Sequence, residues 1–167
     1  TGHIVEYTGE AIRNLTMEQR MTICNMSIEA GARAGLISPD EKTVEYLRGR
    51  RHVPKDADFD KEAAYWLSLA SDSAATYDVS LSIHCDEISP FVTWGTNPSM
   101  GTGIAGRVPY AADFESQADR EALHQALAYM NLEEGTPMSS IAIQHVFIGS
   151  CTNARLGDLQ AACKVVE

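Results

Sequence analysis

Hydrophobic residues recur every three to four positions over much of the chain, and this period predicts amphipathic helices. The clearest one begins after Thr16, which can cap a helix, while Gln19 completes a Thr-x-x-Gln capping box. Ser38 and Pro39 occupy the cap and the first position of the next predicted helix. The predicted helices span residues 17–35, 38–50, 58–71, 113–132 and 153–166.

Elsewhere the period shortens to two residues, or the chain becomes continuously apolar, and both patterns predict strands. Residues 76–84 alternate aliphatic with polar side chains, as in a half-buried strand. Residues 141–149 form an almost continuous apolar run, typical of a strand buried on both faces. With a short strand or an extended segment at 3–7, the pattern predicts an α/β fold in which the helices over 17–35 and 153–166 pack on the sheets.

Between these elements, residues 87–109 are rich in Gly, Pro, Thr and Asn and show little periodicity. A loop of this length is expected to be functional or to be covered by other parts of a larger protein. It contains GTGIAG at 101–106, which matches the glycine pattern of dinucleotide-binding loops. That pattern requires a strand before it and a helix after it, and Asn97-Pro98 and Pro109 provide neither, so nucleotide binding is not predicted.

The composition narrows the possible partners. The 167 residues are 44% hydrophobic and 22% charged, as in a folded domain, and 13 basic against 23 acidic residues give a net charge of -10. Such a surface repels phosphate backbones and anionic lipids, so neither nucleic acid nor a membrane is expected as a partner. The four cysteines form no Cys-x-x-Cys pair, which favours reduced thiols and a cytoplasmic location.

Cys151 is the most prominent candidate for chemistry. The sequence GSCTN follows a predicted buried strand and precedes a predicted helix, so this cysteine lies in a strand-to-helix turn. Free backbone N–H groups and the positive end of the helix stabilise a thiolate in that position, the form that binds metal or attacks carbon. A turn cysteine without any role is the alternative, and the residues alone leave both open.

Asn25 and Glu29 form a second candidate, because they lie four residues apart on the predicted helix over 17–35. At that spacing their side chains lie on one face, beside the apolar stripe. One interpretation is a polar pair lowered into a pocket, with Glu29 orienting a histidine or an arginine. The other is a solvated edge of the helix.

The segment GSCTNARLGDLQAA resembles the first cluster-ligand motif of the aconitase superfamily. The resemblance extends over the whole chain. Residues 2–50, from GHIVEYTGEAIRNL to VEYLRGR, and residues 87–100, EISPFVTWGTNPSM, most resemble the large subunits of bacterial 3-isopropylmalate dehydratases. The resemblance implies a three-layer, doubly wound α/β domain of the aconitase type over residues 1–135, with the first strand and helix of a second, similar domain over 136–167.

For individual residues, the resemblance implies that Cys151 supplies one thiolate to a [4Fe-4S] cluster. Asn25, in ICNM, matches an asparagine close to that cluster, and Glu29 matches a glutamate that pairs with a catalytic histidine. The reaction of the family is that of a hydro-lyase, which removes water from a hydroxy acid and adds it back at the neighbouring carbon. In the subfamily it interconverts 2-isopropylmalate and 3-isopropylmalate in leucine biosynthesis.

Several parts of the family pattern do not occur in this chain. The other two cluster cysteines, the aspartate–histidine motifs that supply acid–base groups, and the swivelling small subunit are absent from it. The expectation is therefore an internal fragment that is inactive alone, holds no intact cluster and self-associates through uncovered apolar faces. A free-standing α/β interaction module without catalysis is one alternative, and a homoaconitase- or aconitase-type dehydratase is another.

Overall fold

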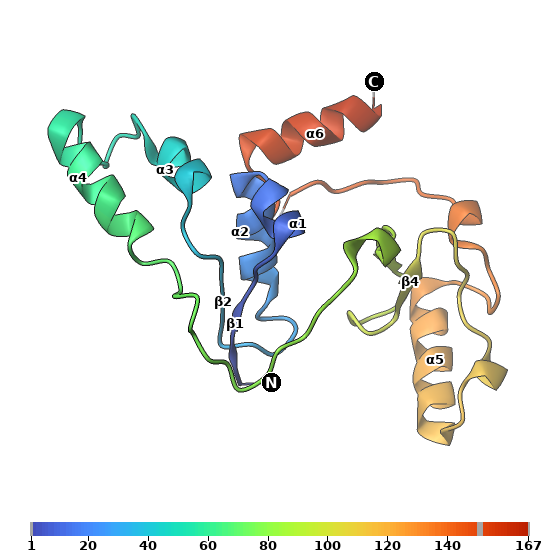
Figure 1. Ribbon diagram of the computed structural model, residues 1–167. Helices are drawn as coiled ribbons and strands as arrows, with labels where there is room; N and C mark the ends of the chain where they lie inside the picture. The colour runs from blue at the N-terminus through green and yellow to red at the C-terminus, as the bar shows by residue number, and fades with distance from the viewer. Residues whose placement is uncertain (1, 150–151, 167) are drawn as a thin grey trace. The chain divides into compact units, whose positions relative to one another are not determined.

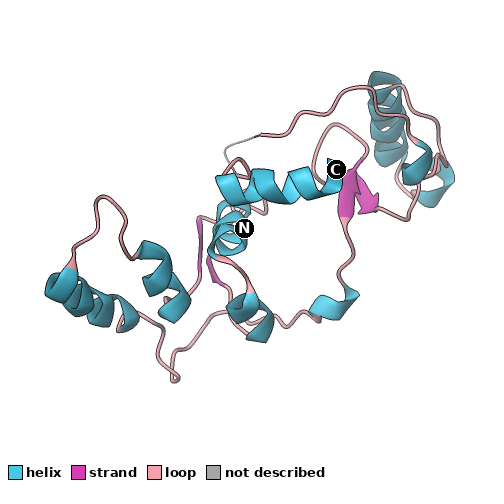
Figure 2. Cartoon of the chain, turned by 90° about the horizontal axis from the view of Figure 1, so that it is seen from above, coloured by secondary structure: helices cyan, strands magenta, loops and turns pink. Residues whose placement is uncertain are grey.

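The computed structural model describes residues 2–149 and 152–166. The chain divides into two compact units, the first made of residues 1–80 and 147–167 and the second of residues 81–146. Helices and irregular segments make up most of both units, and the strands are short (Figure 2). Among the helices of the described residues, none has the length and apolar character needed to cross a membrane.

The first unit contains a pair of parallel strands, β1 (Ile4–Glu6) and β2 (Ala34–Leu36), with Ile4 opposite Ala34. Parallel neighbours require a crossover connection, and here two helices provide it, α1 (Glu10–Asn14) and α2 (Met17–Met26) (Figure 1). The strand predicted over 3–7 is therefore confirmed. The β1–α1–α2–β2 segment makes the chain α/β at the level of fold class.

Helix α2 begins as predicted but ends much earlier. Thr16 accepts a hydrogen bond from the backbone N–H of Gln19 at 3.3 Å, and the Gln19 side chain accepts one from the Thr16 N–H at 2.9 Å. The helix ends at Met26, where the chain passes into tighter turns: the Glu29 N–H donates to Met26 O at 3.2 Å, and Gly31, with a φ of 83°, donates to Ile28 O at 2.9 Å. The buried Ser27 hydroxyl donates to Ile23 O at 2.8 Å and lies 2.7 Å from the Tyr7 hydroxyl. The predicted extension to residue 35 is wrong, since the end of that segment forms β2.

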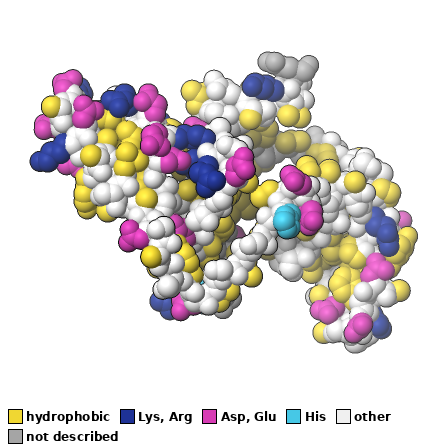
Figure 3. Space-filling view, viewed as in Figure 1, with side chains coloured by type: hydrophobic (Ala, Val, Ile, Leu, Met, Phe, Trp, Pro, Cys, Tyr) yellow, Lys and Arg dark blue, Asp and Glu magenta, His cyan; other side chains and the backbone are white. Residues whose placement is uncertain are grey.

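The remaining helices of the first unit are α3 (Glu41–Leu47), α4 (Asp56–Leu67) and α6 (Leu156–Val166). The first of these is capped by Asp40 rather than by Ser38, which instead donates a hydrogen bond to Glu6 at 2.7 Å. Helices α3 and α4 pack together around a small core of Val44, Phe59 and Ala63. On the visible face of these two helices, acidic and basic side chains are interspersed among hydrophobic ones (Figure 3).

The second unit combines a hairpin with one long helix. Strands β3 (Phe91–Thr93) and β4 (Gly101–Gly103) are antiparallel and lie within the segment predicted to be a loop, and α5 (Gln117–Met130) falls within the predicted helix. Three short 3-10 helices complete it: η1 (Cys85–Glu87), η2 (Ala111–Asp113) and η3 (Met138–Ser140). Its core consists of Trp94, Val108, Leu123, Ala126, Leu127 and Met138.

The strands predicted over 76–84 and 141–149 are wrong for the structure, in which both segments are irregular. Their apolar side chains are exposed, Leu81 to 85% and Phe147 to 88%. A strand needs a neighbour to satisfy its backbone groups, and among the described residues the strands form only two pairs, β1–β2 and β3–β4. The boundary predicted between residues 135 and 136 stays a prediction.

Candidate functional site

The residues that follow Cys151 lie against helix α2. Asn25 Nδ2 donates a hydrogen bond to Thr152 Oγ1 at 2.5 Å, and the Thr22 hydroxyl lies 2.9 Å from Asn153 Oδ1. Arg155 Nη1 donates to the backbone oxygen of Glu18 at 3.3 Å. We call the segment Thr152–Arg155 the docked turn. It belongs to the first unit, as does α2, and Figure 1 shows α6 beginning beside that helix.

The geometry of both partners explains this contact. Residues 18, 22 and 25 are spaced by four and three positions, so they lie along one face of α2. The docked turn runs along this face in the opposite direction, because residue 152 meets residue 25 and residue 155 meets residue 18. Asp158 stabilises the turn by accepting a hydrogen bond from the Arg155 N–H at 3.0 Å. The polar contacts therefore hold the start of α6 in a defined orientation.

Asn25 is placed where it can meet both the docked turn and a ligand. Its side chain is exposed, and the bond from Nδ2 to Thr152 fixes the plane of the amide. The Oδ1 atom makes no hydrogen bond with any described residue. An oriented amide with an open oxygen can accept a hydrogen bond from a hydroxyl group or a protonated base.

Glu29 lies in the turn that follows α2, and its N–H donates to Met26 O at 3.2 Å. The side chain is exposed. Within the described part of the chain, the Glu29 carboxylate makes neither a hydrogen bond nor an ion pair, so the predicted pairing with a histidine is not formed by these residues. Its position three residues after the end of α2 leaves the exposed carboxylate accessible to a group from outside the chain.

Cys151 itself lies outside the described residues, and so does Ser150. Residues 2–149 and 152–166 contain no group of three or more His, Cys, Asp or Glu that could hold a metal ion. Among the described cysteines, partial burial raises the pKa of the Cys24 thiol, and Cys85 and Cys163 are exposed. The ligands of an iron–sulfur cluster are thiolates, and no described residues form a set that could hold one, so the residue that adjoins Thr152 would be a single ligand of such a cluster.

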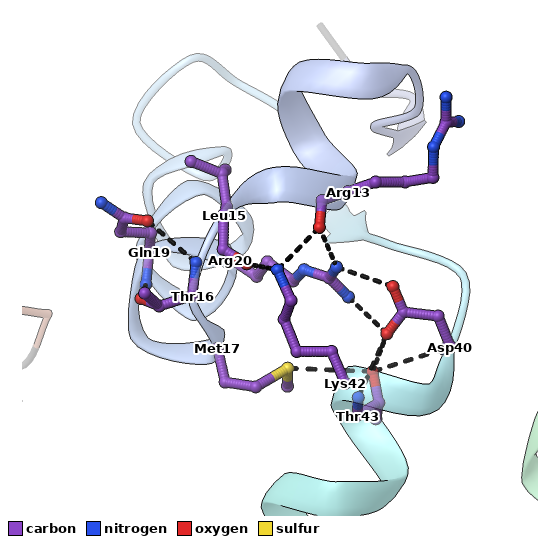
Figure 4. A network of polar contacts seen from close by, with 9 residues as sticks. All are labelled: Arg13, Leu15, Thr16, Met17, Gln19, Arg20, Asp40, Lys42 and Thr43. Carbon is purple, nitrogen blue, oxygen red and sulfur yellow. Dashed lines mark hydrogen bonds and ion pairs between the residues drawn. The ribbon is translucent and has the colours of Figure 1, made fainter.

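An ion pair between a buried arginine and a partly exposed aspartate joins the helices on the other side of α2. The Arg20 guanidinium faces the Asp40 carboxylate and makes two bonds with it, at 2.8 and 2.7 Å, and a third to Arg13 O at 2.9 Å (Figure 4). These bonds lower the pKa of Asp40 to about 2. Lys42 Nζ donates to Arg13 O and Leu15 O at 2.8 and 2.7 Å, so α1, α2 and α3 are tied together.

A cavity of about 450 Å³ opens beyond the carboxyl ends of β1 and β2. Glu6 lies at its wall and accepts hydrogen bonds from Tyr77, Ser38 and Ser71 at 2.6, 2.7 and 2.9 Å. Chiefly the bond from Tyr77, and then that from Ser38, lowers the pKa of Glu6. Neither Asn25 nor Glu29 lines this cavity, so the two places are separate parts of the first unit.

Sequence reasoning missed the partners that hold the docked turn, Thr22 and Asn153, and the ion pair of Arg20 with Asp40. One signal was present for the first of these. Glu18, Thr22 and Asn25 form a polar line at helical spacing along α2. A polar line on a helix that is expected to be buried indicates a polar contact with another segment.

A comparison with protein-family models places the whole chain in one family. The model described as the aconitase family (aconitate hydratase) matches residues 1–167. The match covers both the α2 segment and the docked turn, and so both halves of the contact described above.

Proposed function

Because the chain belongs to the aconitase family, whose members are hydro-lyases, we propose that it is part of the large subunit of a 3-isopropylmalate dehydratase. The reaction proposed is the interconversion of 2-isopropylmalate and 3-isopropylmalate by loss and re-addition of water. The proposed partner is the small subunit that carries the swivelling domain. In the complete protein, elements outside this chain would pair with residues 76–84 and 141–149 and complete a three-layer, doubly wound sheet.

One observation carries the proposal, the hydrogen bond between Asn25 and Thr152. The two residues are 127 positions apart, and the resemblance assigns Asn25 and the neighbour of Thr152 to the same site. A contact between such distant segments supports a common site, because nothing in the local sequence requires it. The preference for isopropylmalate over other hydroxy acids rests on the likeness of residues 2–50 and 87–100 to that subfamily.

Members of this family usually bind a [4Fe-4S] cluster, which supplies a Lewis-acidic iron to the hydroxyl and carboxylate groups of the substrate. Cys151 would contribute one thiolate to it. Asn25, oriented by Thr152, would hydrogen-bond the substrate or a neighbouring catalytic group through its open Oδ1. The exposed carboxylate of Glu29 would accept a hydrogen bond from a histidine N–H outside this chain, and its charge would stabilise the protonated ring.

The test uses the protein in its full encoded length together with its small subunit. Cys151→Ser should abolish both cluster and activity. Glu29→Gln keeps the shape but removes the charge, so we expect unchanged iron and sulfide content and a loss in kcat of about 10²-fold or more. Asn25→Ala should also lower the rate. Steady-state kinetics with isopropylmalate, homoaconitate, citrate and methylcitrate identifies the substrate, by dehydration of the three hydroxy acids and by hydration of the double bond of homoaconitate.

Glu41→Gln provides a matched control, because Glu41 is an exposed carboxylate in the first turn of α3. We expect it to leave the turnover unchanged. If Glu29→Gln also keeps wild-type turnover at full cluster content, Glu29 has no part in catalysis. If the wild-type protein neither dehydrates the three hydroxy acids nor hydrates homoaconitate, the proposed activity is wrong and the interaction module becomes the better hypothesis.

A further inference from the structure

Helix α6 is attached to the first unit mainly through its start. Most of its large apolar side chains are exposed, Leu156 to 73%, Val165 to 86% and Val166 to 79%. Packing of these side chains therefore contributes little to the attachment. The hydrogen bonds between α2 and the docked turn hold the two segments together.

Thr22 occupies the middle of this contact. Its hydroxyl oxygen lies 2.9 Å from Glu18 O, one turn earlier in α2, and 2.9 Å from Asn153 Oδ1. A hydroxyl carries a single proton and can donate to only one of these oxygens at a time. If the Thr22 hydroxyl donates to Asn153 Oδ1, the bond is the one described above. If it donates to Glu18 O instead, an Asn153 amide turned through 180° would donate from its NH₂ group to the Thr22 oxygen. Either arrangement joins Thr22 to Asn153.

The contact between Thr22 and Asn153 affects how firmly Asn25 holds Thr152. The bond from Asn25 to Thr152 is exposed, and a single exposed bond competes with water. Thr22 lies three residues before Asn25 on the same face and holds the residue that follows Thr152. Two contacts at adjacent residues fix the orientation of the docked turn, which one contact cannot do.

We propose that Thr22 is a positioning residue: through Asn153 it holds Thr152 on Asn25 and thereby orients the segment that adjoins Cys151. This inference rests on the proposed function for its catalytic meaning. The contact itself can be tested separately. Arg155 plays a smaller part, because its bond to Glu18 O is longer, 3.3 Å, and the same nitrogen also lies 3.4 Å from Asp158 Oδ2.

The experiment compares Thr22→Val with Thr22→Ser in the full encoded protein. Valine keeps the branched shape without the hydroxyl, whereas serine keeps the hydroxyl. Hydrogen exchange of the backbone amides over residues 159–163, in α6, measures the attachment. In the same samples, the rate at which the visible absorption of the cluster is lost in air measures its protection. We expect Thr22→Val to accelerate both about fivefold, the effect of one net hydrogen bond, and Thr22→Ser to behave as wild type.

A double-mutant cycle identifies the partner. If Thr22 acts through Asn153, the double variant Thr22→Val/Asn153→Ala should lose no more protection than either single variant. The amides of α3 serve as an internal control, because a general loss of stability would accelerate their exchange as well.

Three outcomes would overturn the inference: wild-type exchange in Thr22→Val, equal losses in the Val and Ser variants, or additive effects in the cycle. Failure of the proposed function would show differently. The wild-type protein would then bind no cluster and dehydrate no hydroxy acid, while the exchange measurement would still decide whether Thr22 holds the docked turn.

Discussion

Asp40 has two roles at the residue scale, since it caps α3 and pairs with Arg20, which is only 3% exposed. Asp40→Asn separates them, because asparagine is an equally good cap but carries no charge. At pH 7 the change leaves a buried guanidinium without its counter-charge, and we expect a loss of about 3 kcal/mol in the free energy of unfolding. Urea unfolding of the full encoded protein measures it.

The pH dependence of that loss provides the control. The pKa of Asp40 is about 2 in the folded protein, below the roughly 3.9 of an unfolded chain. The ion pair therefore stabilises the fold fully above pH 4, and its contribution falls as the pH drops from about 4 towards 2. The difference between wild type and Asp40→Asn should shrink over this range. A difference that is the same at pH 7 and pH 3 would contradict the assignment to charge.

Gly35, in β2, is a second residue with a measurable role. A Cβ atom added there would lie against the Ser27 side chain and 2.9 Å from Cys24 O, both at the end of α2. Because the backbone of α2 cannot move away without disturbing the helix, we expect Gly35→Ala to destabilise the protein by about 1–3 kcal/mol. Gly103→Ala is a suitable comparison, since its nearest contact is a side-chain oxygen at 3.3 Å. Equal thermal stability of the two variants would argue against close packing of β2 on α2.

At the scale of elements, one substitution in α6 should stabilise the protein. Gly157 lies in its first turn, and an added Cβ would meet the Glu18 side chain at an ordinary 3.6 Å. Gly157→Ala removes backbone freedom from the unfolded chain without a clash, so we expect a gain of about 0.5–1 kcal/mol, seen as slower hydrogen exchange in α6. Faster exchange would mean that α6 lies closer to α2 than this contact indicates.

The elements that the sequence predicted well are those with local signals. The capping box of Thr16 and Gln19 predicted the start of α2, and the period after residue 153 predicted α6. The end of α2 could not be predicted in the same way. Apolar residues continue at helical spacing to Ala32, whereas the helix ends at Met26, beside Ser27, which contacts Tyr7 twenty positions away. Contacts of this kind leave no period in the sequence.

The candidate site shows the same limit. The residue types and the family resemblance singled out Asn25, Glu29 and Cys151, but only the structure brings Asn25 to Thr152. The strand predictions at 76–84 and 141–149 failed for the opposite reason. An apolar pattern indicates that a segment can be buried, but a buried strand also requires a neighbouring strand, which the pattern does not predict.

For the whole molecule, the exposed apolar segments have a consequence in solution. Leu81, Ile83 and Phe147 are 72–88% exposed, more than a stable monomer usually leaves in contiguous stretches. We expect the isolated 167-residue chain to self-associate, and more strongly at high salt, because salt screens the repulsion from a net charge of -10. Sedimentation velocity over a range of concentrations tests this, with Leu81→Gln and Phe147→Gln expected to weaken association. A monomer at every concentration and salt level would disprove it.

The contact between α2 and the docked turn also bears on the order in which the protein folds. The bonds of Arg20 with Asp40 and of Tyr7 with Ser27 each span 20 residues, whereas those to Thr152 and Asn153 span 127 and 131. Closing the longer loop costs about 1.7 kcal/mol more in chain entropy, a cost that prior folding of residues 81–146 would reduce. On a ribosome, β1 to α3 can therefore form while the end of this chain is still being made. The contact beside Cys151 would then be among the last to form and, in mild denaturant, among the first to open.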